Sequence, residues 1–161
     1  MISVQNEDFD FPLEYQQLRE RSTKSGAIVM FVGLVRDFSD NTHVSSMTLE
    51  HYPGMTEKVL QGIAEQASER WPLEGIRIIH RVGELHATDQ IVLVGVSSAH
   101  RIAAYEASQF IMDILKTEAP FWKKESTQDT QGSAGERWVD AKTSDSQQAA
   151  DWHEPGELKG K

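Results

Sequence analysis

The sequence has no cysteine, and this absence excludes more function classes than any other feature of its composition. Without thiols the chain cannot form a disulfide framework, a thiolate zinc site or an iron–sulfur cluster, and it has no cysteine nucleophile. Its six histidines form no HxxxH, HxH or HExxH pattern. We therefore expect no resident metal and no other cofactor, and any sulfur that the protein handles must arrive on another molecule.

Basic residues and long apolar runs are also scarce. The 161-residue chain has 16 Lys and Arg against 25 Asp and Glu, a net charge of −9. A general nucleic-acid binder needs a net basic face, so this class is disfavoured. The longest apolar stretch, at 27–35, is far shorter than the roughly 20 residues of a membrane-spanning helix. The N-terminal residues lack the basic start of a signal peptide, so we expect a cytoplasmic protein.

The hydrophobic periodicity predicts a single α+β domain over residues 1–142. We expect strands at 26–36, 47–52, 75–83, 90–97, 122–127 and 136–141, and helices at 8–21, 53–71 and 99–118. The strand at 26–36 is expected to be buried, and that at 90–97 central in its sheet because it is almost entirely apolar. Short turns between the strands favour mostly antiparallel pairing beside two long helices. Residues 143–161 are acidic with little apolar patterning, which predicts a loosely held tail.

Two cations occupy an unusual place in the first turn of the predicted helix 99–118, directly behind Ser98, which we expect to cap this helix. That turn carries partial positive charge and unpaired N–H groups, so acidic residues are favoured there. His100 and Arg101 stand there instead. The helix dipole, the N–H groups and a guanidinium together favour binding of an anion such as phosphate. An equally consistent interpretation is that Arg101 pairs with a nearby acid and His100 is an exposed cap residue.

Three lysines flank the apolar segment 120–122 (Pro-Phe-Trp). A lysine beside such a surface can lose solvation and become a base or a nucleophile. Alternation along a strand sends Lys123 and Lys124 to opposite faces, so only one of them is expected to face a pocket. The alternatives are structural: Lys116 suits the last turn of its helix, and the pair at 123–124 suits a solubilising strand edge.

A further cation, Arg36, ends the predicted strand 26–36, where a side chain is held rigidly and points into any crevice at the strand end. A solvated arginine is the commoner case. For His80 and Arg81, inside a strand, we expect a structural role in which one side chain packs and the other faces solvent. The predicted cationic pocket consists of Arg36, His100, Arg101, Lys116 and Lys123. Positive charge concentrated in an acidic protein favours a small anionic, phosphorylated ligand.

Several ordered blocks within residues 25–142 closely resemble the large, catalytic subunit of bacterial molybdopterin synthase. They are LEHYPGMTEK (49–58), IIHRVGEL (78–85), SSAHR (97–101), QFIMDILKTEAPFWKKE (109–125) and ERWVDA (136–141). The resemblance implies an α/β-hammerhead-type fold and a heterotetramer, in which a central homodimer carries one small ubiquitin-like subunit at each end. It also implies a sulfurtransferase. The family moves sulfur from a C-terminal Gly-Gly thiocarboxylate on the small subunit to cyclic pyranopterin monophosphate (precursor Z), forming the molybdopterin dithiolene.

The resemblance also implies roles for particular residues, by matching motifs. The catalytic residues are Lys116 and Lys123. The substrate-binding residues are Leu34, Val35, Arg36, His100, Arg101, Lys116, Lys123, Lys124 and Glu125, and the pocket is lined by Phe31 and Met112. Similar chains can carry an arginine where this one has Lys142, and a lysine there would weaken bidentate phosphate recognition.

Two other function classes remain open from the residues alone. One is a non-catalytic module that captures a phosphorylated pterin or nucleotide and hands it on. The other is a phosphoryl-chemistry enzyme, but neither a P-loop nor an acidic metal-binding motif supports it. Lys116→Ala separates the first alternative from a synthase, since a binding module loses only affinity whereas a synthase loses turnover.

Overall fold

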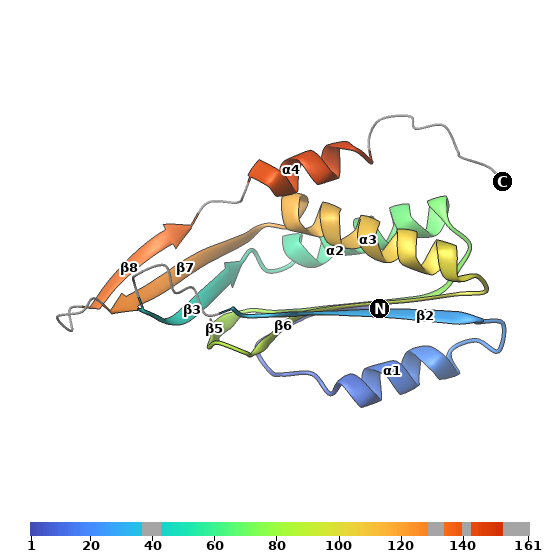
Figure 1. Cartoon of the computed structure of the whole chain (residues 1–161), viewed down its shortest axis with the longest axis horizontal. Helices are drawn as coiled ribbons and strands as arrows, with labels where there is room; N and C mark the ends of the chain where they lie inside the picture. The colour runs from blue at the N-terminus through green and yellow to red at the C-terminus, as the bar shows by residue number, and fades with distance from the viewer. Residues whose placement is uncertain (37–42, 129–133, 140–142, 153–161) are drawn as a thin grey trace.

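A computed structural model describes residues 1–36, 43–128, 134–139 and 143–152 (Figure 1). Its elements in chain order are β1 (Ile2–Gln5), α1 (Phe11–Glu20), β2 (Ala27–Leu34), β3 (His43–His51), α2 (Met55–Arg70), β4 (Leu73–Arg81), β5 (Gly83–Leu85), β6 (Gln90–Ser98), α3 (Arg101–Glu118), β7 (Phe121–Gln128), β8 (Ala134–Val139) and α4 (Thr143–Ala150). The strands form two four-stranded sheets. The predicted α+β class, with mostly antiparallel strands, is confirmed.

The first sheet has the order β1-β4-β6-β2, and only the β1–β4 pair is parallel. Helices α2 and α3 cover one face of it and α1 covers the other (Figure 1). The core between the sheet and the two long helices includes Leu60 of α2, Phe110 and Ile114 of α3, and Ile78 and Val94 of the sheet, all fully buried. As predicted, β6 is central.

The second sheet, of order β5-β3-β7-β8, lies at one end of the molecule (Figure 1). All of its strand pairs are antiparallel. It meets the first sheet at a small apolar cluster formed by Val35, Met47, Leu49 and Leu85, to which Ile91 of β6 adds a partly buried side chain. A short link, residues 119–120, joins the end of α3 directly to β7 of this sheet.

Two local expectations were wrong. The strand β2 is not buried, because it lies at the edge of its sheet and leaves Phe31 41% and Leu34 54% exposed. Ser98 does not cap α3, because it is the last residue of β6, where its hydroxyl donates to the carbonyl of Pro72 at 2.8 Å. The N-cap is His100, whose extended backbone leads into the helix without a side-chain capping bond.

The segment after residue 142 differs from the expected loose tail. Residues 143–150 form α4, and Ala149 is buried in the main core. The Trp152 indole contacts the Phe110 ring edge-on at 5.5 Å between centroids, and its Nε1 donates to Asp113 Oδ2 at 2.9 Å. The acidic composition of the segment gave no indication that Ala149 and Trp152 pack against the core. Residues 153–161 lie outside the described residues.

Trp152→Ala is expected to destabilise the protein by about 2 kcal/mol, because it removes a large, partly buried ring from the core. Urea unfolding measures this effect. Gln148→Ala on the exposed side of the same helix is the control, with an expected change within about 0.5 kcal/mol. Equal stability of the two variants would mean that α4 contributes nothing to the fold.

Candidate active site

The inner face of β7 carries a lysine and a glutamate that form a largely buried ion pair. Lys123 Nζ lies 2.6 Å from Glu125 Oε1, and the two side chains are 23% and 3% exposed. Their cross-strand neighbours on β3 are Leu49 and Met47, both in the small apolar cluster. The short contact with a buried carboxylate fixes the position of the lysine nitrogen. The site therefore holds one cation whose geometry is set by packing.

The outer face of β7 carries Trp122 and Lys124. Trp122 is 47% exposed. Lys124 Nζ pairs with Glu136 of β8 at 2.5 Å and lies 5.8 Å from the Trp138 ring centroid. Strand alternation thus places the two adjacent lysines on opposite faces, as predicted, and Lys123 is the one on the same face as the small apolar cluster. Lys124 is not brought to the same face as Lys123.

The C-terminal turn of α3 places Lys116 next to the link that enters β7. The helix ends at Glu118, with the Ala119 N–H donating to the Leu115 carbonyl at 3.1 Å. Lys116 is exposed, at the end of the helix where the dipole favours a cation. Met112, one turn earlier, is partly buried against the main core. Lys116 and Lys123 therefore stand on either side of one short corner, residues 119–121.

The end of β2 approaches the same region through Val35. This residue is 7% exposed and belongs to the small cluster with Met47 and Leu49, the residues opposite Glu125 and Lys123. Its N–H donates to the Asp89 carbonyl at 2.9 Å, and its carbonyl accepts from the Thr88 N–H at 2.8 Å. These bonds fix the exit of β2, and Arg36 follows directly with an exposed side chain.

His100 and Arg101 lie at the opposite end of α3 from Lys116. Lys116 lies fifteen positions after Arg101 along the helix, which is about 22 Å at 1.5 Å per residue. The sheet register agrees, because Ser98 pairs with the first residue of β2 and Gln90 with the last. Figure 1 shows the two ends of α3 apart. One chain therefore does not gather the five predicted cations into one pocket.

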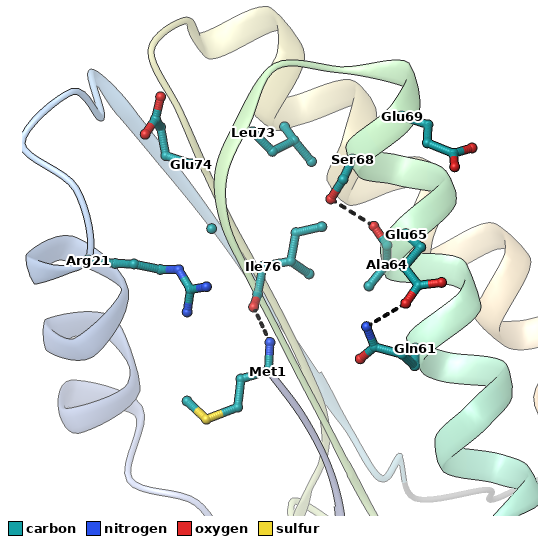
Figure 2. A pocket seen from close by; sticks show the side chains of 11 residues that line it. Met1, Arg21, Gln61, Ala64, Glu65, Ser68, Glu69, Leu73, Glu74 and Ile76 are labelled. Atoms are coloured by element: carbon teal, nitrogen blue, oxygen red, sulfur yellow. Dashed lines mark hydrogen bonds between the residues drawn. The ribbon is translucent and has the colours of Figure 1, made fainter.

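A groove of about 470 Å³ lies elsewhere, at the β4 edge that the short strand β1 leaves open (Figure 2). The Met1 ammonium donates to the Ile76 carbonyl there at 2.8 Å. Glu65 and Glu69 of α2 and Glu74 of β4 line it, and none of the residues predicted for the site does. The three carboxylates outnumber the two cations that also line the groove, Arg21 and the Met1 ammonium, which disfavours an anionic substrate there, and we keep the α3–β7 corner as the candidate site.

The corner also contains a residue whose importance the sequence analysis missed. His80 of β4 is 7% exposed and stacks on Phe121, the first residue of β7, with ring centroids 3.8 Å apart. Arg81 is bonded to the Asn6 and Gln90 carbonyls, at 3.2 and 2.9 Å. The sequence signal for His80 was a histidine at an apolar position of a strand.

No cluster of three or more His, Asp or Glu suited to a metal ion occurs among the described residues. No helix in the described part of the chain is long and apolar enough to cross a membrane. Lys142 lies outside the described residues.

Known proteins resemble this chain over almost its whole length. The family described as "MoaE protein" matches residues 4–118. The molybdopterin synthase catalytic subunit of Vibrio cholerae is 56% identical over 151 residues, covering 94% of this chain and 97% of the relative. The Escherichia coli K12 subunit is 52% identical with the same coverage.

Solved structures give the same picture. The MoaE protein from Burkholderia ambifaria has a TM-score of 0.80 and 48% identity, with 95% of this chain and 97% of that chain covered. Molybdopterin synthase from Staphylococcus aureus has a TM-score of 0.75 and 32% identity, with 85% and 95% covered. The described fold, including the small sheet, is therefore one already seen in these proteins.

Proposed function

The chain belongs to the MoaE family of molybdopterin synthase catalytic subunits, and on that premise we propose that it transfers sulfur to precursor Z. The donor is the C-terminal Gly-Gly thiocarboxylate of a small ubiquitin-like carrier subunit, and the product is the dithiolene of molybdopterin. The absence of cysteine agrees with this role, because the sulfur comes with the carrier.

The observation that carries the proposal is the α3–β7 corner, where Lys116 and the Lys123–Glu125 pair flank residues 119–121. The thiocarboxylate sulfur forms a C–S bond to precursor Z while the bond from that carbon to a cyclic-phosphate oxygen breaks, and water then cleaves the acyl–sulfur bond and returns the carrier as its carboxylate. Both steps develop negative charge on oxygen. The Lys123 side chain, positioned by its ion pair with Glu125, stabilises that charge. Lys116 can exchange a proton, as general acid or base. Arg36, exposed beside the small cluster, supplies a cation for the substrate's phosphate.

The phosphate site also needs His100 and Arg101, which lie about 22 Å of helix away from Lys116. We infer that a second copy of the chain supplies them, so that each site of a central dimer contains residues of both subunits. The exposed apolar side chains Phe31 and Leu34 on the edge strand β2 give a surface that association would bury.

Reconstitution tests the function. The chain is incubated with precursor Z and a thiocarboxylated carrier, and molybdopterin is detected by chromatography of its fluorescent oxidation product. The expected result is product that depends on all three components. Binding of precursor Z without any product would instead identify a binding module.

Glu125→Gln is expected to reduce both stability and turnover, because it leaves Lys123 without its charge partner in a mostly buried position. The stability loss should be about 1–3 kcal/mol by urea unfolding, and kcat should fall about tenfold. The control is Glu136→Gln, which breaks the exposed pair with Lys124 and should change stability by less than about 0.5 kcal/mol. Equal effects of the two variants would contradict the role given to the buried pair.

A further inference from the structure

We propose that His80 is a positioning residue of the reaction: by stacking on Phe121 it fixes the corner between α3 and β7, and with it the relative placement of Lys116 and Lys123. This inference rests on the proposed function for its kinetic consequence. Its structural part stands on the geometry of the corner alone.

The corner is short and has one ring at its centre. Helix α3 ends at Glu118, and β7 begins at Phe121, whose N–H donates to the Ala119 carbonyl at 2.8 Å. The Phe121 ring packs partly buried against the main core, and the His80 ring stacks on it at 3.8 Å with 19° between the planes. The Phe121–His80 contact therefore ties the corner to β4 of the first sheet.

His80 occupies a position that an aliphatic residue would ordinarily fill. It alternates with Ile76 and Ile78, which belong to the core beneath α2 and α3. Its Nδ1 lies 2.8 Å from the Arg81 carbonyl, and because a carbonyl only accepts, Nδ1 carries the proton. Burial lowers the pKa of His80 to about 4, so the ring is neutral near pH 7. A buried polar ring at this place contributes a flat, oriented surface for Phe121 that Ile or Val cannot provide.

Both lysines are attached to the corner through a few backbone bonds. Lys116 lies in the last turn of α3, and Lys123 follows Phe121 by two residues. A shift of the corner therefore changes the position of Lys116 relative to Lys123. Because a displacement of about 1 Å can reduce a rate roughly 100-fold, anchoring of Phe121 affects turnover without any contact between His80 and substrate.

The test compares His80→Leu, which removes the ring, with His80→Phe, which keeps a ring that can stack. Amide hydrogen exchange at 121–123 should be about tenfold faster in His80→Leu and near wild type in His80→Phe. In the reconstituted synthase, kcat of His80→Leu should fall about tenfold or more, with the KM for precursor Z within about threefold, and His80→Phe should restore most of it. Ile79→Val, on the opposite face of β4, is the control for a general effect on the strand.

Phe121→Leu serves as the second variant, and carries the test if His80→Leu does not fold, because it removes the same stack from the other side. Its exchange and kcat should change as in His80→Leu, and the double variant should be no worse than either single one. Unchanged exchange in these variants would overturn the positioning role whether or not the wild-type chain makes molybdopterin. Equal loss of kcat in His80→Phe and His80→Leu would also overturn it. If the wild-type chain made no product but amide exchange at 121–123 were still faster in His80→Leu, the proposed function would be rejected. The structural role of His80 at the corner would then still be supported.

Discussion

Lys116→Arg is expected to lose nearly all synthesis of molybdopterin, with a fall in kcat of at least about 100-fold. Arginine keeps the positive charge and suits the last turn of α3, where Lys116 is exposed. A guanidinium, however, does not give up its proton near neutral pH, so it cannot act as acid, base or nucleophile. The variant therefore separates proton transfer from electrostatic stabilisation. Turnover in the reconstituted system, with saturating carrier, is the measurement.

The matched control is Lys24→Arg, an exposed lysine between α1 and β2, which should keep wild-type turnover. Lys123→Ala should be impaired less completely than Lys116→Arg, because its role in the proposal is to stabilise charge. If Lys116→Arg retained substantial activity, Lys116 would supply only its charge, and His100 would become the first candidate for proton transfer.

Mixing two inactive variants is expected to restore activity if His100 and Arg101 act across a dimer. Arg101→Ala alone should be almost inactive, since hydrogen bonds to a charged phosphate are lost. Lys116→Ala alone should be inactive for the reason above. In a mixed dimer of the two, one site would lack both residues and the other would have both. Random exchange of subunits therefore predicts about a quarter of the wild-type rate.

The control mixes Lys116→Ala with Lys123→Ala, two residues on either side of the same corner of one chain, where no mixed dimer regains an intact site. Each mixture is assayed after subunit exchange is verified by mass spectrometry with one variant isotopically labelled. If the Arg101 and Lys116 variants failed to complement after verified exchange, both residues would have to act within one chain. That outcome would conflict with the length of α3.

Most elements could be predicted from the sequence because their periodicity was clear. The stripe that includes Leu60, Ile63 and Ala67 places α2, and the apolar run at 90–97 places the central strand β6. The exposure of β2 could not be predicted, since an apolar run does not show whether a partner strand lies on both sides. The packing of α4 depends on Trp152, a single ring in an acidic segment.

For the site, the sequence identified residue types better than their arrangement. Alternation along β7 correctly assigned Lys123 and Lys124 to opposite faces. Arg101 and Lys116 are far apart because they lie at opposite ends of α3. The sequence-based prediction grouped them by charge and did not consider the length of this helix. The burial of Glu125 depends on β3 lying beside β7, a pairing between residues far apart in the sequence. Such pairings arise from the tertiary fold, so no local motif encodes them.

The central claim is sulfur transfer from the carrier to precursor Z, and isotopic tracing tests it most directly. The carrier's thiocarboxylate is prepared with ³⁴S, the chain and precursor Z are added, and the product is analysed by mass spectrometry. The account predicts a dithiolene in which both sulfur atoms carry the label, formed only when this chain is present, with the carrier returned as its carboxylate. Unlabelled product, or labelled product formed equally well without the chain, would contradict it.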